Sequence, residues 1–246
     1  MKIKIDASMF REAMNAVSGL VDEITIQVTN EDMNILCMDP ANVAMVSFNM
    51  PSSSAIEWEC TTTEEEPVEK VCIKLTDLNT ILKRTSKDDI LNIETIDNQL
   101  QIGISGYKDF TIPLIAEEES KEQKMPPLEH KAKVKLPTKK ILDAIEDCSI
   151  ADEGVIFSVS KDKLVLSAQG DLKKAAITLE GEDVHIESEA DQKVKFAIEY
   201  LRKMVLPKTA TTVEVCLNTD YPLMLKYTAK GYKMEFLLAP RIENSD

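Results

Sequence analysis

"VDEITIQVTNEDMNIL", residues 21–36, has a counterpart in the second half of the chain, "ADEGVIFSVSKDKLVL" at residues 151–166. In each segment an acidic residue pair precedes an apolar strand pattern, which passes through a polar turn and resumes as a second strand pattern. Any α+β chain with short hairpins shows similar punctuation, but here the order of the flanking elements repeats as well. The two segments therefore predict a duplicated domain.

Outward from these segments, each half reads as helix, strands, helix, strands, which predicts an α+β fold. Asp6 or Ser8 is expected to cap the first helix and Thr76 the second. Amphipathic helices are expected at residues 7–21, 76–88, 138–148 and 197–208. Strands are expected at residues 24–28, 33–38, 90–96, 100–105, 109–115, 155–159, 164–168, 212–217, 222–227 and 232–239.

The acidic, proline-containing run "AEEESKEQKMPPLEH", residues 116–130, lies at the middle of the 246-residue chain. A run of this composition between two similar halves is typical of a linker. The predicted organisation is an N-terminal domain at 1–115, a connector at 116–131 and a C-terminal domain at 132–246.

The composition indicates a soluble intracellular protein. Hydrophobic residues make up 43% of the chain, and 29 Lys and Arg against 43 Asp and Glu leave a net charge of −14. The five cysteines are odd in number and widely spaced, so we expect core residues rather than disulfides or a zinc site. No apolar run has the length of a membrane span, and no signal peptide is recognisable.

The sequence contains no recognisable catalytic motif. His130 and His185 lie in polar surroundings without metal-ligand spacing, so we expect both to be solvated, and we expect no metal and no cofactor. Phosphate-binding glycine motifs and a nucleophile elbow are missing too. Asp39 is an isolated acid, so an enzyme would need carboxylates assembled from distant segments. The chain is therefore predicted not to be an enzyme.

Positive charge is concentrated in the expected helices. Their net charges in chain order are 0, +1, −1 and +2, which leaves −16 for the rest of the chain. Such a distribution would let one surface attract phosphates, although Lys and Arg also favour solvated helix faces for their helix propensity alone. No aromatic residues alternate with the basic ones, so any binding to nucleic acid would be independent of sequence.

The stretches "LCMDPANVAMVSF", "LTDLNTILKRTSKDDIL", "KFAIEYLRKMV" and "FLLAPRIE" resemble the DNA sliding clamp of archaea and eukaryotes, the proliferating cell nuclear antigen family. The resemblance covers nearly the whole chain. It implies the clamp fold, in which two duplicated domains of antiparallel sheets carry two helices each and three subunits form a ring with the helices lining the hole. It also implies a processivity factor that encircles double-stranded DNA without regard to sequence and tethers a replicative DNA polymerase, flap endonuclease, DNA ligase and clamp loader.

By the same resemblance, the helices would present basic side chains to DNA. Asp143, Glu146 and Glu199 stand where eukaryotic relatives carry arginine, and Thr80 replaces a lysine. The second domain is therefore predicted to hold DNA less strongly than the first. The DNA-facing residues are expected to be Arg11, Lys83, Arg84, Lys87, Lys139, Lys140, Arg202, Lys203 and Lys208.

The resemblance further implies a hydrophobic pocket for client peptides beneath the connector. Adaptable methionines and a connector that can pair with a peptide backbone suit varied clients. The expected pocket residues are Met38, Asn42, Val43, Met45, Met125, Pro126, Leu128, Pro222, Leu237, Leu238, Ala239, Pro240 and Ile242.

Subunits are expected to meet edge to edge, with Phe110 and Ile112 of one facing Ile177 and Leu179 of the next. Three alternatives remain: one subunit of a heterotrimeric clamp, an interaction scaffold of the same fold that does not bind DNA, and an enzyme whose site joins distant carboxylates, such as Asp39 with another acid. The expected location is the cytoplasm if the source is an archaeon, and the nucleus if it is a eukaryote.

Overall fold

The computed structural model describes residues 1–60, 62–63, 65, 67–116, 123–204 and 210–241. Contacts divide the chain into two compact units. The first contains residues 1–40, 46–125 and 230–234, and the second contains residues 41–45, 126–229 and 235–246. Among the described helices, none has the length and apolar character that crossing a membrane would require.

The two halves of the chain have the same order of helices and strands. In the first half a 3-10 helix, η1 (Ser52–Ser54), is inserted between the fourth and fifth strands. The first half contains β1 (Lys2–Asp6), α1 (Ala7–Val17), β2 (Glu23–Val28), β3 (Asp32–Met38), β4 (Ala44–Pro51), β5 (Glu57–Glu59), β6 (Glu69–Lys74), α2 (Leu75–Leu82), β7 (Ile90–Ile96), β8 (Gln99–Ile104) and β9 (Lys108–Pro113). The second contains β10 (Ala132–Pro137), α3 (Thr138–Ser149), β11 (Gly154–Val159), β12 (Leu164–Gln169), β13 (Lys174–Leu179), β14 (His185–Ser188), β15 (Gln192–Ala197), α4 (Ile198–Lys203), β16 (Thr212–Leu217), β17 (Leu223–Ala229) and β18 (Tyr232–Leu238). The predicted duplication is therefore confirmed element by element, as is the α+β class.

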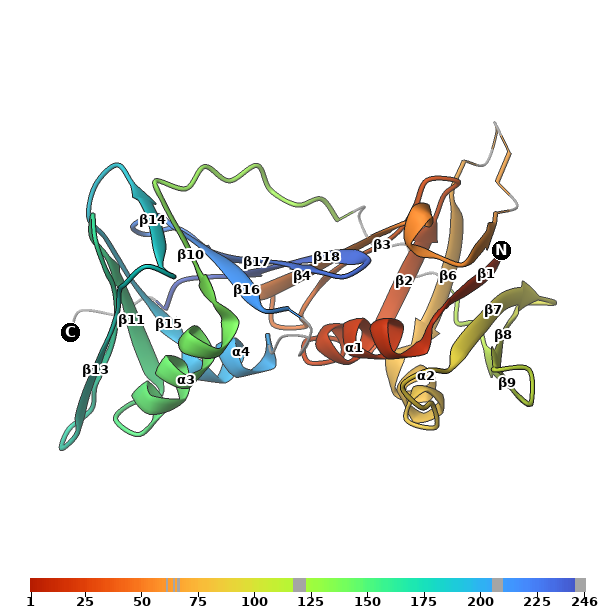
Figure 1. Cartoon of the computed structure of the whole chain (residues 1–246), viewed down its shortest axis with the longest axis horizontal. Helices are drawn as coiled ribbons and strands as arrows, with labels where there is room; N and C mark the ends of the chain where they lie inside the picture. Colours follow the sequence, from red (N-terminus) through yellow and green to blue (C-terminus); the bar gives the residue numbers. More distant parts are fainter. Residues whose placement is uncertain (61, 64, 66, 117–122, 205–209, 242–246) are drawn as a thin grey trace. The chain divides into compact units, whose positions relative to one another are not determined.

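All the strand pairs for which a register is described are antiparallel. In the first unit, one sheet has the order β5-β1-β7-β8-β9, and β4, β3, β2 and β6 are hydrogen-bonded neighbours in that order. In the second unit, β13-β12-β11-β15 form one sheet, and β14, β10, β16, β17 and β18 are hydrogen-bonded neighbours in that order. Strands β9 and β13 each lie at the end of their sheet. In each unit the two helices contact each other and lie on the same side of the strands (Figure 1).

Helix α1 follows the sequence pattern but ends earlier than expected. The Asp6 carboxylate accepts a hydrogen bond from the Met9 N–H at 2.8 Å, which confirms Asp6 as its cap. Phe10, Ala13, Met14 and Val17 are buried on one face. The helix stops at Val17 rather than 21, with Ser18 as its C-cap, and Gly19, which disfavours helix, follows Ser18.

Helix α2 departs from the expected residues 76–88 at both ends. Its first turn is capped by Asp22, whose carboxylate accepts the Thr76 N–H at 2.9 Å and also binds the Thr76 hydroxyl, so the prediction of Thr76 as the cap is wrong. The helix ends at Leu82 because polar side chains compete for its backbone groups. The Thr85 hydroxyl donates to the Leu82 carbonyl at 2.7 Å, and the Ser86 N–H donates to Asp89 at 2.7 Å.

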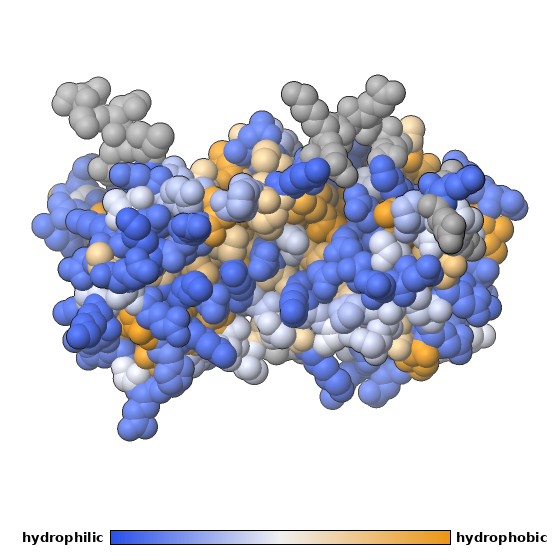
Figure 2. All heavy atoms as spheres, turned by 90° about the horizontal axis from the view of Figure 1, so that it is seen from above, coloured by the Kyte–Doolittle hydropathy of each residue, from blue (hydrophilic) through white to orange (hydrophobic). Residues whose placement is uncertain are grey.

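Aromatic side chains lie at the centre of each unit. Phe48 contacts Tyr232 in the first unit, with ring centroids 5.5 Å apart. In the second, Phe157 and Phe196 meet edge to face at 5.6 Å, and Tyr227 meets Phe236 at 6.1 Å. Hydrophilic side chains cover most of the face shown in Figure 2, as the high content of charged residues leads one to expect.

Candidate nucleic-acid interface and peptide site

The first unit carries its basic side chains at the end of α2 and on the loop that follows. Because α2 ends at Leu82, Lys83, Arg84 and Lys87 lie beyond the helix and not on it, contrary to the expected helix of residues 76–88. All three side chains are exposed. Lys83 caps the C-terminus of α2, where a positive charge is favoured by the helix dipole. Among the described residues, no carboxylate forms an ion pair with any of the three, so their charge is available to a ligand.

Arg11 has a structural contact in addition to its expected role. It is half-buried on α1, and its guanidinium donates to the Thr85 carbonyl at 2.9 Å and to the Thr85 hydroxyl at 3.2 Å. Arg11 therefore ties α1 to the loop after α2. Its remaining N–H groups leave room for a further acceptor.

The second unit differs because its basic side chains are paired with carboxylates. Lys139 binds Asp143 one helical turn away, and Lys140 binds Asp183 at 2.7 Å. Lys203 binds Glu199 at 2.6 Å. The described basic residues expected to face DNA in this half are thus largely neutralised, and Lys208 lies outside the described residues.

Arg202 has the most extensive of these pairings. Its guanidinium binds the two carboxylate oxygens of Glu146 at 2.8 and 2.6 Å, and it donates to the Ser149 hydroxyl at 2.8 Å. The hydrogen bond from Arg202 lowers the pKa of the Glu146 carboxyl. Likewise, the hydrogen bond from Lys140 lowers the pKa of Asp183. Each acid therefore stays ionised and keeps its basic partner occupied.

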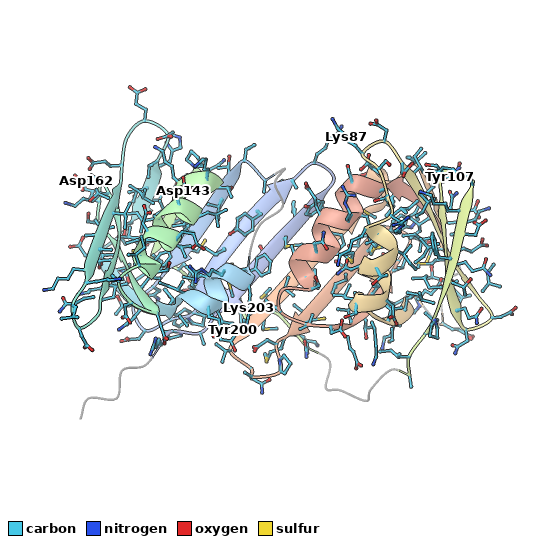
Figure 3. All side chains as sticks on the ribbon, turned by 90° about the horizontal axis from the view of Figure 1, so that it is seen from below. Lys87, Tyr107, Asp143, Asp162, Tyr200 and Lys203 are labelled. Atoms are coloured by element: carbon cyan, nitrogen blue, oxygen red, sulfur yellow. The ribbon has the colours of Figure 1, made fainter. Side chains whose placement is uncertain are left out.

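Two aromatic rings lie beside lysines, which the sequence pattern missed. The Lys108 ammonium lies 4.8 Å from the centroid of the exposed Tyr107 ring, and the Lys203 ammonium lies 5.0 Å from that of Tyr200. Figure 3 shows Lys203 and Tyr200 together on α4, and Lys87 and Tyr107 at the same end of the first unit. The i, i+3 spacing of Tyr200 and Lys203 is a signal that could have indicated their pairing on a helix.

Several residues expected in the peptide site lie in the second unit. The Ala239 N–H donates to the Val43 carbonyl at 2.9 Å, which brings the segment before β4 next to the segment after β18. Val43, Leu128, Pro222, Ala239 and Pro240 are half-buried, and Asn42 and Pro126 are exposed. These seven residues are the accessible part of the expected pocket in this unit.

Other expected pocket residues are placed differently. Met45, Leu237 and Leu238 have exposed fractions of 7%, 4% and 0%, so they belong to the hydrophobic core of the free chain. Met38 and Met125 are half-buried in the first unit. Ile242 lies outside the described residues.

The expected subunit contacts lie on the two end strands. Within the described ranges, β9 pairs with β8 alone and β13 with β12 alone, so each has a free backbone edge. Phe110 and Ile177 are half-buried, whereas Ile112 and Leu179 are buried in their own units. Phe110 and Ile177 are thus the two residues of this set that remain accessible.

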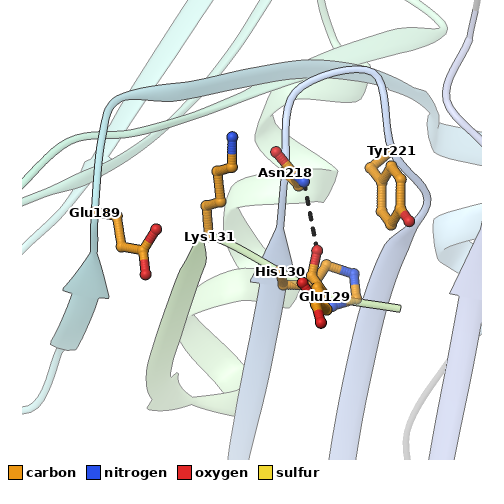
Figure 4. Close-up of a pocket in the computed structure, with 6 residues that line it drawn as sticks. All are labelled: Glu129, His130, Lys131, Glu189, Asn218 and Tyr221. Atoms are coloured by element: carbon orange, nitrogen blue, oxygen red, sulfur yellow. Dashed lines mark hydrogen bonds between the residues drawn. The ribbon is translucent and has the colours of Figure 1, made fainter. Parts of the chain in front are cut away.

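His130 is not the solvated residue that its polar surroundings suggest. It is half-buried, with Nε2 3.1 Å from the Pro222 carbonyl and its ring edge-on to Tyr221 at 6.1 Å. It lines a pocket of about 270 Å³ (Figure 4) whose other residues are Glu129, Lys131, Glu189, Asn218 and Tyr221. The prediction of a solvated histidine is wrong for His130 and confirmed for the exposed His185.

The remaining reactive residues form no site in the part of the chain that the structure describes. Cys37, Cys72, Cys148 and Cys216 are buried, as expected, while Cys60 is half-buried. Burial raises the pKa of the Cys37 and Cys148 thiols to about 11, so they stay protonated. Asp39 is buried, and the described residues contain no cluster of side chains suited to a metal ion.

The sequence matches two family models. Residues 2–109 match the proliferating cell nuclear antigen N-terminal domain, and residues 124–242 match its C-terminal domain. The chain belongs to the proliferating cell nuclear antigen family.

Curated members of the proliferating cell nuclear antigen family align with the chain over almost its whole length. The DNA polymerase sliding clamp of Nanoarchaeum equitans is 32% identical over 96% of this chain and 97% of the relative. That of Thermococcus gammatolerans is also 32% identical, over 96% of each chain. As a member of this family, the chain functions as a DNA polymerase sliding clamp.

Solved structures of the proliferating cell nuclear antigen family share the fold. The PCNA2–PCNA3 complex of Sulfolobus tokodaii matches with a TM-score of 0.86 and 29% identity, over 99% of this chain and 100% of the other. PCNA of A. fulgidus, bound to the C-terminal region of FEN-1, matches with a TM-score of 0.89 and 21% identity, over 99% of both chains. The described residues of the chain therefore have the clamp fold.

Proposed function

We propose that three copies of this chain close into a ring around duplex DNA, and that the ring is a non-catalytic tether within the compartment that holds the DNA. The observation that carries this proposal is the pair of free strand edges, β9 in one unit and β13 in the other. An unpaired edge of this kind favours pairing with another strand. Two different edges on one chain give a head-to-tail contact, which can close into a ring.

The charges at the strand ends favour antiparallel pairing between copies. Lys108 begins β9, while β13 is preceded by Lys173, begins with Lys174 and is followed by Glu180. Antiparallel pairing brings Lys108 of one copy near Glu180 of the next, whereas parallel pairing would bring it near two lysines. Phe110 and Ile177 add apolar contact between the strands. This chain therefore suits a second copy of itself as partner.

The exposed basic side chains after α2 support the proposed contact with DNA. Lys83, Arg84 and Lys87 can reach phosphates without first breaking an ion pair. In the second unit, Lys139, Lys140, Arg202 and Lys203 would have to leave their carboxylates first. A ring with few strong phosphate contacts can slide, because enclosure keeps it on the duplex.

We further propose that residues 116–131 connect two domains, 1–115 and 132–246, and that client proteins bind beside this connector. The accessible residues Val43, Leu128 and Pro222 would receive an apolar anchor of the client. PCNA of A. fulgidus was solved with the C-terminal region of FEN-1, so a flap endonuclease is the first client to test. The replicative polymerase, DNA ligase and clamp loader are further partners.

The test is retention on circular DNA. Labelled protein would be placed on a nicked plasmid with a clamp loader, and half of the sample would be linearised before gel filtration. We expect retention on the circle and loss from the linear form, with a native mass of about 82.5 kDa, three times the 27.5 kDa of the chain. Equal retention on both forms would contradict encirclement.

A heterotrimer is the second candidate, because the matching structure from Sulfolobus tokodaii is a complex of two different subunits. A chain that stays monomeric at all accessible concentrations, and assembles with a second clamp subunit from its own source, would favour this candidate.

A further inference from the structure

Residues 129–131, just before β10, form hydrogen bonds with other parts of the second unit. The Asn218 side-chain amide donates to the Glu129 carbonyl at 3.4 Å, and the Glu189 N–H donates to the Lys131 carbonyl at 3.1 Å. Between them, the His130 ring lies against the turn that joins β16 and β17 (Figure 4). His130 therefore makes the central contact of this attachment.

The His130 contact reaches the proposed peptide site directly. Its Nε2 lies 3.1 Å from the carbonyl oxygen of Pro222, a distance at which the Nε2–H tautomer donates a hydrogen bond. Pro222 is one accessible residue of the proposed site, and Leu128, two residues before His130, is another. The position of the histidine ring thus sets the spacing between two sides of that site.

We propose that His130 is a positioning residue, which anchors the carboxyl end of the connector to the β16–β17 turn, and that acid weakens this anchor. The anchor itself rests on the contacts of residues 129–131. Its effect on peptide binding rests on the proposed function.

The electrostatic environment explains why acid would act against the anchor. Burial is the main cause that lowers the pKa of His130. The hydrogen bond to the Pro222 carbonyl raises the pKa, whereas the positive charges of Lys226 on β17 and Lys133 on β10 lower it further. The other titratable groups around the pocket are Glu129, Lys131, Glu189 and Tyr221, and Asp220 lies on the same turn, exposed.

The sign of the pH effect follows from this lowered pKa. A docked His130 takes up a proton less readily than a free histidine, whose pKa is about 6.5. The anchor is therefore at full strength above that value, where both states are neutral. The anchor weakens as the pH falls below about 6.5, because His130 in the released connector takes up a proton at a higher pH than docked His130 does.

Two substitutions separate the hydrogen bond from the charge. His130→Gln keeps an N–H donor but cannot titrate, and His130→Phe keeps an aromatic ring but loses the donor. His185→Gln is the matched control, because the other histidine is exposed. All variants would first be checked for native mass and circular dichroism.

The first measurement is amide hydrogen exchange of residues 123–131 at pH 7.5 and 5.5, corrected for the intrinsic pH dependence of exchange. We expect acid to speed exchange at least twofold in the wild type and in His185→Gln, and to leave His130→Gln unchanged. His130→Phe should exchange about three- to tenfold faster at both pH values, the factor expected for one lost hydrogen bond. The imidazole of His130 should also titrate at a lower pH than a free histidine, whose pKa is about 6.5.

The second measurement is the affinity for a synthetic peptide of the C-terminal region of a flap endonuclease. We expect acid to weaken binding at least twofold in the wild type, with no such change in His130→Gln. If His130 titrates like a free histidine and exchange is independent of pH, the anchor is overturned. A wild type that shows the exchange pattern but binds no peptide at either pH would support the anchor and contradict the proposed peptide site.

Discussion

The unequal pairing of basic residues predicts that the first domain makes most of the direct phosphate contacts. The perturbation is Lys83→Ala with Arg84→Ala, compared with Lys139→Ala with Lys140→Ala. Both double variants remove two positive charges, so they are matched in net charge. They differ because Lys139 and Lys140 are bound to Asp143 and Asp183, whereas Lys83 and Arg84 have no carboxylate partner among the described residues.

Counterion release sets the magnitude. Each phosphate contact contributes about −0.9 to the slope of log K against log salt, so the loss of two contacts reduces the magnitude of the slope by about 1.8. At 0.1 M salt, each contact corresponds to about 1.2 kcal/mol, so affinity should fall by up to about 2.5 kcal/mol. We expect the slope of the Lys139 and Lys140 variant to change by less than about 0.5. A lysine that is paired with a carboxylate neutralises little phosphate charge, so its removal changes the number of released counterions only slightly.

The assay is fluorescence anisotropy of a short labelled duplex between 25 and about 200 mM potassium chloride, a range over which screening changes strongly. Light scattering of both variants would confirm that the native mass is unchanged. Equal slopes for the two variants would refute the reasoning, because the ion pairs of the second unit would then make no difference to DNA contact.

Three further predictions test the fold and the assembly. Asp22→Ala should cost about 1 kcal/mol in urea unfolding because α2 loses its cap. Hydrogen bonds from the first turn of α2 lower the pKa of Asp22, so the wild type should lose this contribution as the pH falls below about 4, whereas the variant has no carboxylate at this position and should show a smaller loss. Parallel acid curves would argue against the cap. Gly170→Ala would place a Cβ 2.4 Å from the Ala151 carbonyl oxygen and should destabilise the second unit by about 1–3 kcal/mol in the same assay, whereas wild-type stability would show that the backbone yields easily. Phe110→Asp should lower the native mass in light scattering, with Gln101→Asp on the neighbouring strand as control; a Phe110→Asp protein of unchanged mass would exclude β9 from the subunit contact.

The repeat was predictable from sequence because it depends on local patterns. Apolar periodicity and turn residues placed both helices and five strands of each half, and they did so in the same order. Seven strands were missed: β1, β4, β5, β6, β10, β14 and β15. Of these, β1 ("KIKID") and β10 ("AKVKLP") alternate apolar and lysine residues as half-buried strands do. Family resemblance, and not periodicity, indicated the two end strands as contact surfaces.

Contacts between distant segments were not predictable in the same way. Asp22 caps α2 from 54 residues away, and Arg202 reaches Glu146 across 56 residues. The His130 attachment depends on the β16–β17 turn, 92 residues further along the chain. No local pattern encodes such pairs, so the extent of charge pairing in the second unit and the half-buried position of His130 emerge from the folded chain alone.

The two free strand edges have a consequence for how the proposed ring assembles. One copy carries one free β9 edge and one free β13 edge, and an open chain of two or three copies still carries one of each, because each junction pairs the β9 of one copy with the β13 of its neighbour. Adding copies to an open chain therefore never removes these two free edges. Ring closure pairs them with each other, and it does so without a further loss of translational freedom. Ring closure should consequently be the strongly favoured step, and open intermediates should be scarce at equilibrium. A ring that opens at one junction should expose a β9 edge and a β13 edge at the same time.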